Sequence, residues 1–279
     1  MKNTFKWMFA AILICGLTVS SCKKDPVPTP DPDPEPTTQT VLAGMTAVGV
    51  ALYDSVTYSY EYDDQYRLVR SKAVRTNSDY VIRDYQFTYS DGHLTVEGPA
   101  NESYITYVCT LDSEGRIIHI DETNVMNDTT TSIQHYDYTY DAEGRMESAF
   151  NITEDVVTDG ATQSYTWEGE EIRSINTNDG AIVIDYETSD VPAQAKFDLL
   201  SYYGGFQELC TQGFFGTLPA HLPSKRTMTT DLSIPGMPPY VFINNYTYTL
   251  DAKGRLATIE DTTESNNETT TYTLIWEER

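Results

Sequence analysis

The histidines are the residues of this sequence best suited to bind a metal, and they are His93, His119, His135 and His221. Zinc hydrolases bring two histidines together on one helix as H-x-x-x-H or H-E-x-x-H, and neither spacing occurs here. A chain reversal near residues 126–128 would place His119 beside His135, either as two metal ligands or as ordinary sheet residues. We favour the second interpretation, so the sequence predicts no metal site and no cofactor.

Catalytic nucleophiles and phosphate loops leave no recognisable pattern either. The sequence contains no Gly-rich phosphate loop, no G-x-S-x-G turn and no Cys–His arrangement. Its 42 Asp and Glu residues could supply the two carboxylates of a glycosidase, but so many acids form neighbouring pairs by chance. We therefore predict no catalytic residue and favour a non-catalytic protein. The alternative is a glycan- or peptide-processing hydrolase that uses inner-face carboxylates.

The elements that would position any site are short strands rich in Tyr and Thr. From about Val41 onward, polar and apolar residues alternate and turn signals are frequent, which is typical of antiparallel strands. The stretch "YTYDAEGRMES" has near-copies along the chain, which predicts one hairpin per repeat. The hairpins are expected at residues 58–70, 85–96, 107–120, 136–148, 165–175 and 246–259.

Turn chemistry predicts the register of each hairpin. In "DAEG" the Asp141 carboxylate can cap the turn amides while Gly144 adopts the left-handed conformation. Counting outward from that turn gives a set of facing pairs: Tyr140 with Met146, Tyr138 with Ser148, Tyr62 with Leu68, Tyr89 with Leu94, Leu111 with Ile117, Trp167 with Ile172 and Leu250 with Leu256. Every hairpin then has one aromatic and one polar face. The first copy has Tyr66 in place of Gly, which predicts a different turn there.

Stacked hairpins of this kind predict a mainly β fold. We expect an antiparallel meander over residues 41–279 that forms one strongly curved sheet, a half-barrel or a barrel. A short helical insertion is expected at about residues 192–216, because Pro192 suits a helix start and apolar residues then recur at helical spacing. It would pack on the concave aromatic face. Outward positions such as Glu61 and Asp137 are polar, so we do not expect a transmembrane barrel.

Polar residues on the expected inner face, away from the turns, form a candidate ligand site. The register count places each of them opposite a partner on the same face: Arg70 opposite Tyr60, Asp121 opposite Tyr107, Glu260 opposite Tyr246 and His119 opposite Cys109. These side chains could hold a sugar or a peptide, or they could be the end of a core that opens to solvent. Cys109 could also form a disulfide with Cys210 of the insertion, and two buried thiols are the alternative.

Residues 1–21 are typical of a lipoprotein signal peptide. A short basic start precedes an apolar run that is too short to span a membrane comfortably, and the ending "VSSC" resembles a lipobox. The resemblance implies cleavage before Cys22, lipidation of that residue and anchoring to the outer membrane. Residues 22–40 continue as a Pro-rich stalk. The pair Lys24-Asp25 resembles an export tag, so we favour the cell surface over the periplasmic face.

The charge of the chain excludes one class of partner. The formal net charge of −24 becomes −26 once Lys2 and Lys6 leave with the signal peptide. A protein with this much negative charge repels nucleic acids, and no nucleic-acid partner is therefore predicted. A glycan, a peptide or another envelope protein stays open as a partner, and the lipid at Cys22 would provide the contact with the membrane.

Two resemblances to known proteins go further than the residues alone. The D-x-x-G-R hairpins resemble the YD repeats of large secreted shell proteins, which implies a continuous curved sheet. The hairpins, together with the insertion and the "LPSK" at residues 222–225, resemble a family of surface or outer-membrane lipoproteins of unknown function from gut bacteria, described as having a porin-like fold. That resemblance implies the fold and no activity.

Overall fold

The computed structural model describes residues 39–50, 54–126, 129–153, 160–177, 181–193, 209, 213–231 and 236–279. The predicted signal peptide, Cys22 and nearly all of the stalk lie outside these residues, and so does Cys210. The part of the chain from Thr38 to Arg279 forms one compact unit. No helix among the described residues is long and apolar enough to cross a membrane.

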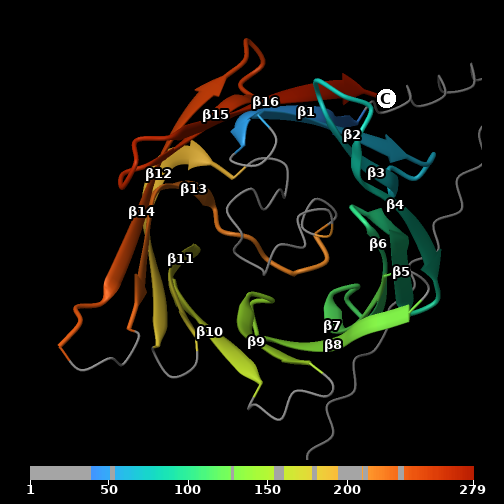
Figure 1. Ribbon diagram of the computed structural model, residues 1–279, viewed down its shortest axis with the longest axis horizontal. Helices are drawn as coiled ribbons and strands as arrows, with labels where there is room; N and C mark the ends of the chain where they lie inside the picture. Colours follow the sequence, from blue (N-terminus) through green and yellow to red (C-terminus); the bar gives the residue numbers. More distant parts are fainter. Residues whose placement is uncertain are drawn as a thin grey trace, which may run out of the picture. The chain divides into compact units, whose positions relative to one another are not determined.

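The described residues form sixteen antiparallel strands in a closed barrel, in which each strand pairs with its neighbours in sequence. The strands are β1 (Thr40–Val50), β2 (Asp54–Tyr62), β3 (Leu68–Arg75), β4 (Val81–Ser90), β5 (His93–Ala100), β6 (Ser103–Leu111), β7 (Ile117–Met126), β8 (Thr129–Tyr140), β9 (Met146–Thr153), β10 (Ala161–Glu168), β11 (Glu171–Thr177), β12 (Ile182–Pro192), β13 (His221–Thr230), β14 (Tyr240–Leu250), β15 (Leu256–Thr263) and β16 (Thr269–Glu278). β1 pairs with β16, from Thr40 opposite Glu278 to Val48 opposite Thr271, and this pairing closes the ring (Figure 1). The predicted meander is confirmed, and the sheet is a full barrel instead of a half-barrel.

The turns of the repeated hairpins lie at one end of the barrel, which we call the turn end. They connect β2 to β3, β4 to β5, β6 to β7, β8 to β9, β10 to β11 and β14 to β15. The pairs that flank these turns are those that the sequence predicts, from Tyr62 opposite Leu68 to Leu250 opposite Leu256. Tyr66 has a φ of 60° and makes the same turn hydrogen bonds as the Gly residues of the other copies, so the expectation of a different turn there is wrong.

One residue beyond most of these turns, the register shifts by a β-bulge. In β9, Tyr140 faces Met146 but Thr139 faces Ser148, so Glu147 is the extra residue and Tyr138 faces Ala149. Bulges at the same place occur in the hairpins β2–β3, β6–β7, β10–β11 and β14–β15. A bulge places two residues opposite one, so each position beyond it moves to the other face of the sheet. The predicted pairing of Tyr138 with Ser148 is therefore wrong.

In three hairpins, the Arg that ends the turn also contacts the next hairpin. The Asp141 carboxylate accepts hydrogen bonds from the backbone N–H groups of Glu143 and Arg145 and from Nε of Arg145, at 2.7–3.0 Å. The Arg145 guanidinium lies 5.5 Å from the ring centre of Trp167 in the next hairpin, and Trp167 donates its indole N–H to the Met146 carbonyl. Similar contacts join Arg116 to Tyr140 and Arg67 to Tyr89. The repeated motif therefore holds neighbouring hairpins together.

The connection between β12 and β13 differs from the predicted helix. Pro192 ends strand β12, so it does not begin a helix. Residues 194–208 and 210–212 lie outside the described residues, so the predicted helical segment itself stays a prediction. Leu209 and Phe215 are buried and belong to the hydrophobic core of the barrel, as expected for an insertion that packs on the inner face. In Figure 1 the orange stretch that precedes β13 runs inside the ring of strands.

Candidate functional site

The main candidate site lies at the turn end, where residues 213–220, which we call the plug segment, run across three turns. Ile117 donates its backbone N–H to the Phe214 carbonyl at 2.8 Å, and Thr217 donates its own to the Gly144 carbonyl at 2.8 Å. Ala220 donates to the Glu170 carbonyl at 3.0 Å. The plug segment therefore binds the β6–β7, β8–β9 and β10–β11 turns through their main chains.

Aromatic packing and one glycine fix the position of the plug segment. Phe215 is fully buried, with its ring centre 5.2 Å from that of Tyr138, and Phe214 stacks on Tyr89 at 6.3 Å. Gly216 has a φ of +75°, and a Cβ at this position would lie 2.2 Å from the Gly144 carbonyl oxygen. Only glycine fits there, because a side chain would clash with that backbone and would also be in the left-handed region.

A pocket of about 590 Å³ opens between the plug segment and the two turns β6–β7 and β8–β9. The residues around it are Glu114, Arg116, Ala142, Glu143, Gly144, Ala193, Gly213, Gly216, Thr217, Leu218, Pro219 and Ala220. Several of these are small, so backbone groups are accessible to a ligand. The volume is that of a small-molecule site.

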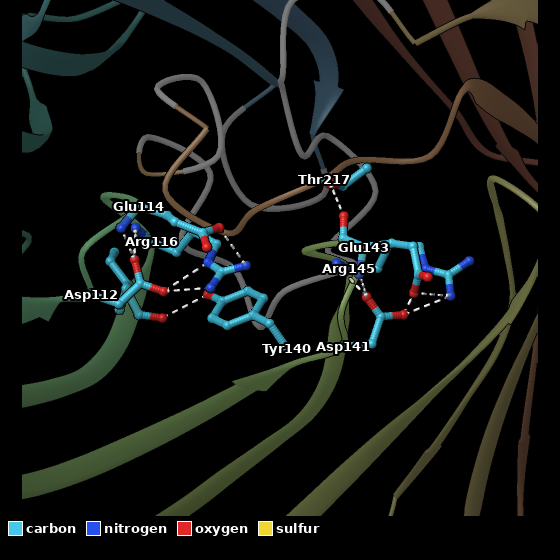
Figure 2. A network of polar contacts seen from close by, with 9 residues as sticks. Asp112, Glu114, Arg116, Tyr140, Asp141, Glu143, Arg145 and Thr217 are labelled. Atoms are coloured by element: carbon cyan, nitrogen blue, oxygen red, sulfur yellow. Dashed lines mark hydrogen bonds and ion pairs between the residues drawn. The ribbon is translucent and has the colours of Figure 1, made fainter. Parts of the chain in front are cut away.

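The charged residues that line the pocket, Glu114, Arg116 and Glu143, belong to two similar clusters (Figure 2). Arg116 is bound to Asp112 at 2.7 Å and to Glu114 at 3.1 Å, and it lies 4.7 Å from the ring centre of Tyr140. The other cluster contains Arg145, Asp141 and Glu143, and the Glu143 carbonyl accepts a hydrogen bond from the Thr217 hydroxyl at 3.0 Å.

Two acids, Glu114 and Glu143, line the pocket together with one arginine, Arg116, so the pocket is net acidic. Burial acts to raise the pKa of Asp112 and of Asp141, but hydrogen bonds from the following Arg outweigh it and hold each pKa below its usual value. These carboxylates are therefore ionised and already paired at neutral pH. The pocket favours a neutral or cationic polar ligand and disfavours an anion.

The seven residues predicted for ligand binding do not share one face. Tyr60, Tyr107 and Tyr246 point inward as expected, and all three belong to or pack against the core. The bulges place Arg70, His119, Asp121 and Glu260 on the outer face, opposite Glu61, Thr110, Val108 and Thr247. The predicted pairs are therefore wrong by one residue. No sequence signal marks this shift, because the same bulge also follows the β10–β11 turn, which lacks the D-x-x-G-R motif.

The residues that face the inward tyrosines are Ser71, Glu122 and Asp261. Burial raises the pKa of both carboxylic acids. Glu122 accepts a hydrogen bond from the Tyr136 hydroxyl at 3.0 Å, and Asp261 accepts one from the Asn244 amide at 2.7 Å. Their strands, β7 and β15, stand eight positions apart in the sixteen-strand ring. These two acids are therefore on opposite walls.

Cys109 is buried, and burial raises the pKa of its thiol to about 12. It faces Leu94 and Ile120, so it does not face His119 as the register count predicted. Its partner in the proposed disulfide, Cys210, lies outside the described residues. The disulfide therefore stays a prediction.

The chain resembles solved porin-like structures in fold. A porin-like protein from Bacteroides uniformis ATCC 8492 aligns with a TM-score of 0.61 and 13% identity, covering 85% of this chain and 96% of the other. A porin-like protein from Bacteroides vulgatus ATCC 8482 aligns with a TM-score of 0.61 and 14% identity, covering 86% and 99%. No protein-family model and no curated protein sequence matches this chain. At this identity the likeness shows the fold alone.

Proposed function

We propose that this protein is a non-catalytic lipoprotein of the cell envelope that binds a neutral or cationic polar ligand, such as a glycan or a short peptide, at the turn end of its barrel. The observation that carries the proposal is the pocket between the plug segment and the β6–β7 and β8–β9 turns. Its walls are held by main-chain hydrogen bonds to three turns, so the site is formed before a ligand arrives.

The outer face of the barrel supports a water-exposed rather than a lipid-exposed wall. A transmembrane barrel presents alternating apolar residues outward along its strands. Here the outward positions include the ion pair of Arg70 with Asp84 and the hydrogen bond of Thr247 to Glu260. Thr139 and Ser148 likewise bond to each other on this face. The proposal therefore places the barrel outside the bilayer, with the lipid at Cys22 as its anchor.

The location at the cell surface rests on the first 40 residues. The lipobox-like ending before Cys22 and the Pro-rich stalk support an outer-membrane anchor with a spacer, and Lys24-Asp25 supports export to the surface. A formal charge of −24 supports a partner other than nucleic acid. The partner in this proposal is a glycan, a peptide or another envelope protein.

The arrangement of the acids supports binding over catalysis. A glycosidase needs two carboxylates within roughly 5–9.5 Å of each other, one of them protonated. The acids with raised pKa values, Glu122 and Asp261, are on opposite walls, and Asp112 and Asp141 beside the pocket are ionised and paired with arginines. The alternative, a glycan- or peptide-processing hydrolase, would use Glu122 or Asp261 as its acid, because burial raises the pKa of both residues.

The test is a glycan and peptide array probed with the soluble chain from Lys23 onward, which lacks the lipidated Cys but keeps the whole barrel. We expect saturable binding to a neutral or cationic member and no change in the bound compound. Turnover of the compound would contradict the proposal and favour the hydrolase, and Glu122→Gln or Asp261→Asn would then abolish that turnover. Failure to bind any array member would favour a protein partner over a small ligand.

A further inference from the structure

Four residues that the pocket does not use meet on the outer face of the β7–β8 pair. His119 stands directly opposite Asp137, and Asp121 stands directly opposite His135. Each strand thus contributes one histidine and one aspartate at alternate positions, which point to the same side. The result is a square of two imidazoles and two carboxylates.

The side chains of this square are in contact. His119 Nδ1 lies 2.7 Å from an oxygen of Asp137, and its Nε2 lies 3.0 Å from Oδ1 of Asp121. The same Asp121 oxygen lies 2.6 Å from Nδ1 of His135. The two rings are nearly parallel, at 21°, with their centres 6.2 Å apart. Asp121 therefore lies between the histidines, and Asp137 lies behind one of them.

We propose that His119, His135 and Asp121 bind a divalent transition metal ion, with Zn²⁺ as the test ion, and that Asp137 is a positioning residue for His119. One ligand atom from each of the three residues can be chosen so that all lie within 4.8 Å of one another. Two imidazoles and one carboxylate are a common ligand set for zinc. Nitrogen ligands favour a transition metal over Ca²⁺ or Mg²⁺, which prefer oxygen.

Asp137 gives this cluster the arrangement that metal-binding histidines commonly have. A ligand histidine usually donates its second ring N–H to a carboxylate, which fixes the tautomer and makes the free nitrogen a better ligand. His119 has this arrangement, because Nδ1 faces Asp137 while Nε2 faces Asp121. A histidine that merely filled a position on a polar sheet surface would not need a carboxylate at each nitrogen.

The change needed to admit a metal is small. With bonds of about 2.0–2.1 Å, ligand atoms around a tetrahedral zinc lie about 3.3 Å apart. The separations between Asp121 and the two histidine nitrogens are 3.0 and 2.6 Å, so they must open by less than about 1 Å. The two histidine nitrogens lie within 4.8 Å of each other, so they must close by at most about 1.5 Å, which side-chain rotation can supply. The side chains of all three residues are 29–46% exposed, which lets an ion enter from solvent and leaves a coordination position for water.

The experiment is a titration of the tag-free chain from Lys23 onward with ZnCl₂, followed by calorimetry, and with CoCl₂, followed by visible absorption. We expect one site, whose binding is abolished by His119→Ala and by His135→Ala, and Co²⁺ bands of a low-coordinate site. Asp137→Asn should weaken binding by about 10- to 100-fold without changing the stoichiometry. Asp121→Asn should remove a ligand and weaken binding at least as much.

The matched controls are His93→Ala and His221→Ala, which remove histidines from other parts of the barrel. Neither should change the affinity or the Co²⁺ spectrum. Thermal unfolding of every variant without metal reports whether it is folded. The proposal is wrong if the wild-type protein binds no Zn²⁺ at millimolar concentration, or if folded His119→Ala and His135→Ala variants bind as tightly as the wild type.

Discussion

Replacement of Gly216 by Ala tests how the plug segment is seated on the barrel. The left-handed φ of +75° costs an alanine about 1–2 kcal/mol. The new Cβ would also lie 2.2 Å from the Gly144 carbonyl oxygen and 3.1 Å from the Tyr140 ring, so the segment has to move. This movement breaks the hydrogen bond from the Thr217 N–H to the Gly144 carbonyl, and the loss of that bond costs roughly a further 0.5–1.5 kcal/mol. We expect a total loss of about 1.5–3.5 kcal/mol in the free energy of unfolding.

The matched control is Gly254→Ala in the β14–β15 turn. Gly254 has a φ of +76°, and nothing lies within 4 Å of a Cβ built there. This variant therefore pays only the conformational cost, about 1–2 kcal/mol. Urea unfolding of both variants isolates the effect of the close contact as the difference between them. The variant at 216 should also lose affinity in the pocket, and the variant at 254 should not.

An equal loss of stability in the two variants would refute the close approach of the plug segment to the β8–β9 turn. Unchanged ligand binding by the variant at 216 would refute the same contact independently. The comparison does not depend on the absolute free energies, because the two glycines have nearly the same φ.

The remaining predictions concern single side chains. Tyr66→Gly should raise the free energy of unfolding by up to about 1 kcal/mol in urea, because relief of the left-handed φ outweighs the loss of the hydroxyl bond to the Arg279 carbonyl. Glu122→Gln should stabilise the protein at pH 7. Burial raises the pKa of Glu122 in the folded state, so protonated Glu122 contributes stability below the pKa of the unfolded state. That contribution is lost as the pH rises through the pKa of the folded state, whereas a glutamine stays neutral at every pH. The gain should vanish at pH 3, and Glu147→Gln is the surface control. Asp141 has the opposite sign, because its folded-state pKa is lowered, so its contribution is lost as pH falls below about 4, and Asp141→Asn should flatten acid unfolding there. In protein kept under a reducing agent, Cys109 should react with iodoacetamide at pH 8 only after unfolding, since burial raises its pKa to about 12. Reaction in the folded, reduced protein at the rate of an exposed thiol would contradict its burial.

The sequence predicts the local part of the fold well, because a hairpin is specified by its own turn. The D-x-x-G-R motif predicts which residues flank each turn, from Tyr140 opposite Met146 to Leu250 opposite Leu256. The motif does not show the β-bulge that follows the turn. Polar and apolar residues keep alternating past the extra residue, so the sequence does not mark where the strand register shifts. Leu111 and Ile117 are therefore placed correctly, while His119 is placed on the wrong face.

The non-local parts of the structure were beyond the sequence for a different reason. Closure of the barrel depends on the pairing of β1 with β16, which are more than 200 residues apart and share no turn. The plug segment likewise binds turns that stand 50 to 100 residues before it, through main-chain groups that any residue has. Gly216 is the one residue whose type indicates a close backbone contact, and a glycine alone does not show which segment it contacts. Contacts of this kind gain nothing from local propensity, so a pattern search cannot find them.

The pocket and the metal site need different residues, so their tests are independent. Glu114 and Glu143 line the pocket at the turn end, whereas His119 and His135 are on the outer wall. Loss of metal binding in His119→Ala should leave ligand binding unchanged. Loss of ligand binding in a pocket variant should leave the Co²⁺ spectrum unchanged.

The most direct test of the proposed binding function is the binding isotherm of the best array compound to the wild-type chain and to the double variant Glu114→Gln with Glu143→Gln. Both side chains are 67% exposed, so their neutralisation should leave the fold intact. Glu147→Gln, which removes the same charge from the bulge residue of β9, is the control. We predict one saturable site, no consumption of the compound, and an affinity at least about 10-fold lower in the double variant, equivalent to 1.4 kcal/mol. An isotherm that is the same in the double variant, or consumption of the compound, would contradict the account.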